Sequence, residues 1–111
     1  MTMNEPMNLI NLLPHPVHIL MDDHTHTIPP SGLVARVIEH EEGNEPIGDI
    51  PTSTIMIGGI INLPDCDGKT KYIVSKVVLM AINRPDLYCP MGVVREDNGY
   101  VVGCTHLGRR A

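Results

Sequence analysis

The chain has 111 residues, enough for one domain and too few for two domains that each bury a core. Hydrophobic residues make up 42% and charged residues 19%, which excludes wholesale disorder, and no apolar run reaches the roughly 18 to 20 residues of a transmembrane helix. The net charge of −5, with only 8 Lys and Arg, excludes a broad phosphate-contacting surface for DNA or RNA. We therefore expect one cytoplasmic domain over residues 1–111, with residues 1–6 as a flexible tail, that binds neither nucleic acid nor membrane.

The core is expected to be aliphatic, because the sequence contains no Trp, no Phe and only three Tyr. Three cysteines, Cys66, Cys89 and Cys104, give an odd number without C-x-x-C spacing. Reduced thiols are therefore expected rather than a disulfide framework.

The first third of the chain predicts short strands separated by turns, because its β-branched segments are brief and interrupted by Pro, Gly and Asp. Prolines on both sides of His15 would end a helix almost as soon as it began. A hairpin is expected next, with Asp22-Asp23-His24 as its polar turn. In chain order, the expected strands are residues 7–13, 17–21, 25–28 and 33–38.

The middle of the chain predicts a loop followed by a buried strand. Residues 40–46 are acidic and rich in turn formers, so we expect an exposed loop there, followed by a short edge segment at 47–51. Residues 54–61 are nearly continuous in apolar, β-branched side chains, which indicates a buried strand. The pair Gly58-Gly59 indicates a bulge within it.

The last third predicts a strand at 72–74, one helix and a hairpin. Ser75 can cap a helix that runs to Arg84, where Pro85 would stop it, and an apolar stripe repeats along it at helical spacing. Asn98-Gly99 lies between two β-branched segments, which is a strong hairpin signal. The fold class expected is α+β, a mostly antiparallel bent sheet or partial β-barrel with one helix at about residues 75–84.

No motif in the sequence indicates catalysis. His24-x-His26 could contribute to a zinc site with a thiol such as Cys104, but a second ligand pair at a recognised spacing is missing. The sequence also lacks a G-x-S-x-G nucleophile motif and a glycine-rich phosphate loop. We therefore favour a non-catalytic role and assign no catalytic residue, metal or cofactor.

Cations placed within apolar strands are the best candidates for a binding site. Arg36 and Arg95 each interrupt a β-branched segment, where an Arg either extends from the rim of the core or pairs with an anion. His15 lies between two prolines that stiffen its backbone, which favours a preorganised contact.

A set of short motifs follows one another along the chain, and together they span most of it. The motifs are Asn11–His15, Ile28–Gly32, Ala35–Val37, Ile50–Pro51, Gly59–Pro64, Tyr72–Ser75, Arg84–Leu87, Pro90, Val94–Arg95 and Gly103–Cys104. Taken in this order, the set resembles an uncharacterised family of small phage, prophage and bacterial proteins that open with N-L-T-P-H. In this chain Leu13 stands where the family usually has Thr. The resemblance implies a phage context, in which small non-enzymatic domains often counter host defence by sequestering a nucleotide signal or binding a host protein.

Our leading hypothesis is an oligomeric phage or prophage protein that captures a small anionic, nucleotide-like ligand without turnover, in the host cytoplasm if phage-encoded. Arginine guanidinium groups would bind the phosphate through paired hydrogen bonds. We also expect a homo-oligomer, because a short chain often needs a subunit interface to form a pocket. One alternative is a module that binds a host protein through an exposed strand edge. The other is a small hydrolase that uses His with a carboxylate or metal. The predicted ligand-binding residues are His15, Arg36, Arg95, Ser75 and Asn11.

Overall fold

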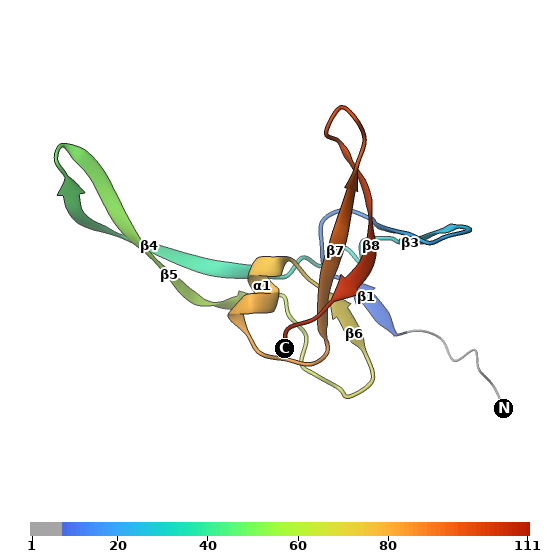
Figure 1. The fold of residues 1–111 in the computed structure, drawn as a ribbon. Helices are drawn as coiled ribbons and strands as arrows, with labels where there is room; N and C mark the ends of the chain where they lie inside the picture. The colour runs from blue at the N-terminus through green and yellow to red at the C-terminus, as the bar shows by residue number, and fades with distance from the viewer. Residues whose placement is uncertain (1–7) are drawn as a thin grey trace.

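The computed structural model describes residues 8–111, so the expected tail at residues 1–6 lies outside the described part of the chain (Figure 1). Eight strands and one short helix follow one another in this part. Their bounds are β1 Leu9–Asn11, β2 Val17–Leu20, β3 Thr25–Ile28, β4 Arg36–Ile47, β5 Ile50–Ile61, β6 Lys71–Ile73, α1 Lys76–Ala81, β7 Leu87–Arg95 and β8 Val101–Gly108.

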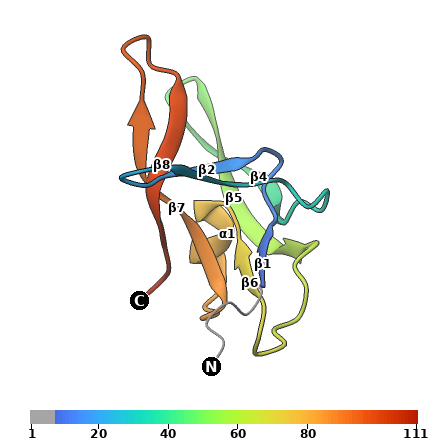
Figure 2. The ribbon, with the colours of Figure 1, turned by 90° about the vertical axis from the view of Figure 1, so that its right-hand side faces the viewer.

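Six of the strands form one sheet in the order β1-β6-β7-β8-β2-β3. The antiparallel pairs β7–β8 and β2–β3 form its longest ladders, whereas the pairs β1–β6, β6–β7 and β2–β8 are parallel and short. The β2–β3 hairpin crosses the β7–β8 hairpin steeply, which bends the sheet (Figure 2). The expected α+β class, with a mostly antiparallel bent sheet and one helix, is confirmed.

The core consists of two apolar clusters on opposite faces of β6. Neighbouring side chains of a strand point to opposite faces, and Tyr72 and Ile73 accordingly belong to different clusters, both buried. The cluster on the α1 side contains Leu12, Ala35, Tyr72, Val74, Val78, Leu79, Leu87 and Cys89. The other contains Leu13, Val17, Ile28, Ile73 and Cys104.

The helix is capped as expected but is shorter than expected. The Ser75 hydroxyl accepts a hydrogen bond from the backbone N–H of Val78, so the N-cap is confirmed. The helix ends at Ala81 rather than at Arg84, because Ile82 already has extended backbone angles. Pro85 disfavours a helical conformation at Arg84, and the chain turns there into β7.

β4 and β5 form a long hairpin that extends away from the rest of the chain, and we call this hairpin the arm (Figure 1). Two expectations were wrong here. Residues 40–46 are exposed, but they belong to strand β4 rather than to a loop, because each pairs with β5 or lies within its ladder. Residues 54–61 form a strand, but most of it is exposed, because no other element of the described residues covers the arm beyond its base. The expected edge segment at 47–51 forms the tip of the arm, with Gly48 and Asp49 in the turn.

Among the helices of the described part of the chain, none is long and apolar enough to cross a membrane.

Candidate functional site

The turn at residues 13–16 divides two cavities of the structure. Leu13 and Pro14 line a cavity beside α1, whereas His15 and Pro16 line a cavity beside the β7–β8 hairpin. The two cavities share no lining residue. Residues 13–16 therefore form part of the wall between two separate cavities.

The cavity beside β7 and β8, which we call the hairpin cavity, has a volume of about 500 Å³. Its wall, as formed by residues 8–111, is mostly apolar and contains one arginine, two histidines and no acidic side chain. Pockets for small ligands commonly have volumes of roughly 300–1,000 Å³ and a few polar groups in an apolar wall. The lining residues are His15, Pro16, Val17, His18, Pro90, Val93, Arg95, Val101, Val102, Gly103 and Cys104.

Arg95, at the end of β7, supplies the guanidinium group of this cavity. Its Nη1 donates a hydrogen bond of 3.0 Å to the backbone carbonyl of Gly99, in the turn that joins β7 to β8. Within residues 8–111 it forms no ion pair with a carboxylate. Because a guanidinium has five N–H donors, Arg95 keeps donors for an anionic ligand while the turn holds it in place.

His15 and His18 supply the imidazoles of the hairpin cavity. Nδ1 of His15 donates to the carbonyl of Pro16 at 3.0 Å, because a carbonyl oxygen can only accept, and Nε2 is therefore left for another partner. Nδ1 of His18 is 2.9 Å from the hydroxyl of Thr27 on the neighbouring strand β3. Each imidazole is thus oriented by one contact and keeps one ring nitrogen for a ligand.

Asn11 shapes the turn and does not face a cavity. Its side chain is 1% exposed, and its Nδ2 donates to the carbonyls of His15 at 2.9 Å and Ile28 at 3.1 Å. Its Oδ1 accepts from the backbone N–H of Leu13 at 2.9 Å. Both ends of the amide are engaged inside the protein, so Asn11 positions the His15 turn instead of contacting a ligand directly.

Arg36 and Ser75 lie together in the cavity on the other side of the turn. This cavity has a volume of about 290 Å³, and Glu39 also lines it. The Ser75 hydroxyl is engaged as the helix cap. The structure therefore brings together His15 and Arg95 but places Arg36 and Ser75 in a second cavity, where a carboxylate is present.

The sequence reasoning did not select His18 or Gly103, which both line the hairpin cavity. A methyl group at Gly103 would lie 2.7 Å from the backbone oxygen of His18, so only glycine lets β8 approach β2 this closely. The expected β7–β8 hairpin could have indicated the opposite wall, because its register places Val101 opposite Arg95. No local signal indicates that β2 lies beside β8.

No group of three or more His, Cys, Asp and Glu side chains among residues 8–111 is placed to hold a metal ion. His24 and His26 are exposed, and His24 contacts the carboxylate of Asp23. Cys104 is buried at the crossing of β8 and β2, where it pairs with Ile19.

Comparison of the chain with protein-family models, curated proteins and solved structures found no match. The residues and geometry of the hairpin cavity therefore provide the basis for a function.

Proposed function

We propose that this chain is a binding protein that captures a small anionic, nucleotide-like ligand in the hairpin cavity and does not turn it over. The observation that supports this function is the composition of the cavity wall: among residues 8–111, Arg95, His15 and His18 line it and no carboxylate does. An anionic group placed there would meet the free N–H donors of Arg95 without like-charge repulsion from a carboxylate in this wall.

The rest of the wall suits the uncharged part of such a ligand. Valine and proline side chains from β2, β7 and β8 form most of it. These side chains offer apolar contact rather than the aromatic stacking that many nucleobase sites use. The ligand class proposed is therefore a phosphate or other anion attached to a compact apolar or heterocyclic body.

The biological part of the proposal depends on the family resemblance. A phage or prophage protein of this kind would lower the free concentration of a nucleotide-derived signal and so counter host defence by sequestration. Sequestration requires tight binding of a ligand that stays chemically intact, and both properties can be measured.

The test is a thermal-shift and calorimetric titration of the full chain with a panel of cyclic and ADP-ribose-type nucleotides. A ligand of the hairpin cavity raises the melting temperature of the wild type and of Arg36→Ala, which is the matched control in the other cavity. Arg95→Ala is expected to lose about 1.5–3 kcal/mol of binding free energy, as for a hydrogen bond to a charged group. Binding that is lost in Arg36→Ala and kept in Arg95→Ala would refute the assignment to this cavity.

Recovery of the ligand separates sequestration from hydrolysis. The bound nucleotide is expected to return chemically intact after the protein is denatured and removed. Steady conversion of the ligand that stops in His15→Ala would support the hydrolase alternative instead.

The second candidate is a module that binds a host protein through an exposed strand edge. The observation that favours it is the exposed edge of β5 on the arm, which pairs with no strand of the described chain. This candidate would be supported if the chain is monomeric on its own and captures a host protein, and if Ile55→Lys abolishes that capture.

A further inference from the structure

The arm is a two-stranded sheet with few stabilising contacts to the rest of the described chain. Each strand has twelve residues, and contacts with α1 are made only near the base of the arm. Large apolar side chains along β5 remain exposed, among them Ile55 at 63% and Ile57 at 56%. An isolated hairpin is only marginally stable in water, and a third or fourth strand supplies what it lacks.

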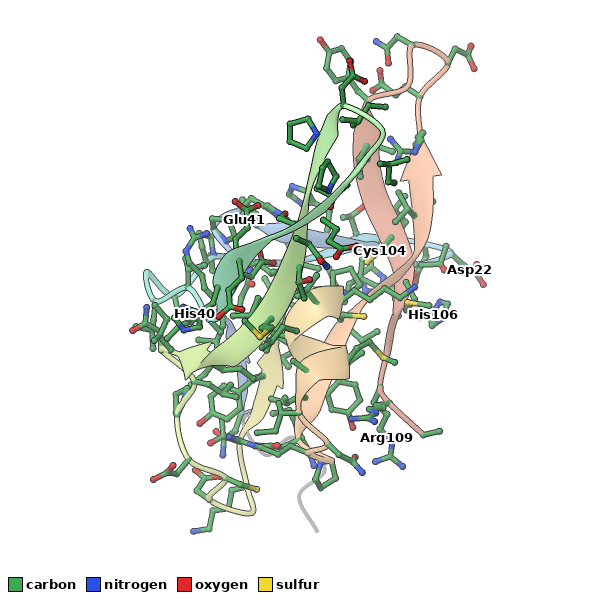
Figure 3. All side chains as sticks on the ribbon, turned by 90° about the vertical axis from the view of Figure 1, so that its left-hand side faces the viewer. Asp22, His40, Glu41, Cys104, His106 and Arg109 are labelled. Atoms are coloured by element: carbon green, nitrogen blue, oxygen red, sulfur yellow. The ribbon has the colours of Figure 1, made fainter. Side chains whose placement is uncertain are left out.

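The two strands of the arm differ sharply in charge. β5 contains no charged residue, whereas β4 contains Glu39, Glu41, Glu42 and Glu45. Figure 3 shows Glu41 and His40 on β4 in the arm. A copy of β4 placed against β4 would bring carboxylates together, but a copy of β5 placed against β5 would not.

Between Thr52 and Ile57, the outer edge of β5 also lacks the features that usually prevent edge pairing. Such edges are normally protected by charged side chains, by Pro or by a bulge. In β5, Pro51 lies at one end, and the extra residue Gly58 forms a bulge at the other, because Ile38 pairs with Gly59 and Glu39 with Ile57. The segment from Thr52 to Ile57 between these two features is regular, uncharged and free to pair.

We infer that the β5 edge of the arm binds the β5 edge of a second copy of this chain, antiparallel, to form a four-stranded sheet in the order β4-β5-β5-β4. Directly opposite residues of an antiparallel pair point to the same face of the sheet. When the two strands are also related by two-fold symmetry, the symmetry axis must therefore pass through a pair of identical residues and not between two successive residues. When the axis passes through the pair of Ile55 residues, the Ile55 and Ile57 side chains of both copies lie on the same face of the four-stranded sheet. This inference goes beyond the proposed function and does not depend on a ligand.

The first measurement is sedimentation velocity of the full chain. The wild type is expected to sediment as a dimer or as a larger assembly built on it, and Ile55→Lys is expected to raise the dissociation constant by about tenfold or more, because two lysines then oppose each other. Tyr100→Lys, at another exposed apolar position, is the matched control and leaves the assembly unchanged. A wild type that is monomeric at high concentration would overturn the inference and leave the β5 edge free for a different protein.

The second measurement is cross-linking with oxidised glutathione in a Cys66→Ser background, which removes the exposed native thiol. Ile55→Cys is expected to form a disulfide-linked dimer, because opposite residues of an antiparallel pair lie about 4.5–5.5 Å apart at Cα, within disulfide range. Glu41→Cys, opposite Ile55 on β4, is the control, since its copies would be about three strand spacings, or ~14 Å, apart. A disulfide-linked dimer of the Glu41→Cys variant, with none of the Ile55→Cys variant, would place the contact on β4 and refute the assignment.

Discussion

Arg84 donates two hydrogen bonds to the buried carboxylate of Asp86, from Nε to Oδ1 at 3.0 Å and from Nη2 to Oδ2 at 2.6 Å. Asp86 is 2% exposed, and its backbone carbonyl accepts from the N–H of Tyr72 at 2.9 Å. The ion pair and this hydrogen bond therefore anchor the connection from α1 to β7 beside strand β6 of the sheet.

Removal of this carboxylate is expected to destabilise the fold strongly. Asp86→Ala leaves the mostly buried Arg84 without its partner, and the loss should be about 3–5 kcal/mol in the free energy of unfolding measured by urea denaturation. Asp23→Ala, which removes an exposed carboxylate beside His24, is the control and should change stability by less than about 1 kcal/mol.

The same pair predicts how stability depends on pH. Its hydrogen bonds with Arg84 hold the pKa of Asp86 below its ordinary value. The stabilisation is therefore complete above the pKa of the unfolded chain, about 3.9, and is lost as the pH falls through the lower pKa of the folded state. Urea unfolding at several pH values between 7 and 2 should show a steeper acid loss in the wild type than in Asp86→Asn. Parallel curves for the two proteins would contradict this role.

Gly103 is expected to be essential to the contact between β8 and β2. A methyl group there would meet the His18 carbonyl and Leu20, so Gly103→Ala should cost about 1–3 kcal/mol of stability and distort the wall of the hairpin cavity. Gly43→Ala on the arm is the matched control, because a methyl group at that strand position meets no atom within 4 Å. Equal stability of the two variants would show that β8 and β2 can separate without cost.

Asn11 is expected to hold the turn that divides the two cavities. Asn11→Ala removes three hydrogen bonds to backbone groups and leaves the buried N–H of Leu13 without a partner, with an expected loss of about 2–3 kcal/mol. Asn44→Ala, on the exposed arm, loses only solvent-exposed hydrogen bonds, with the Thr54 hydroxyl and the backbone N–H of Glu45, and should change stability by about 0.5 kcal/mol or less. Chemical denaturation of both variants tests the difference.

The three thiols should react with iodoacetamide at very different rates. Cys66 is exposed, whereas burial raises the pKa of Cys89 and of Cys104 and keeps both as unreactive thiols at neutral pH. Intact mass should show one adduct on the folded protein, none on folded Cys66→Ser and three on the denatured wild type. Rapid modification of Cys104 in the folded state would mean that its thiol becomes exposed to solvent through the hairpin cavity.

Several elements could be predicted from the sequence because their signals are local. Asn98-Gly99 sets the β7–β8 hairpin, Ser75 caps α1, and the polar turn at 22–24 joins β2 to β3, all within a few residues of the structure they determine. The predicted helix end is three residues too late because Pro85 indicates only where a helix cannot continue, and it does not report that the backbone is already extended at Ile82.

The arm and the cavities could not be predicted, because both depend on what lies next to a segment rather than on the segment itself. The apolar residues 54–61 favour a buried strand, but burial requires a covering element, and the arm extends where none exists within the described chain. His15 and Arg95 are far apart in sequence, and only the crossing of β2 and β8 places them in one wall, while Arg36 falls on the other side of the turn. The class of the fold and its individual turns follow from local backbone preferences, which can be read along the chain. Which cations share a cavity and which apolar strand is left uncovered depend on long-range packing, which no local stretch of residues encodes.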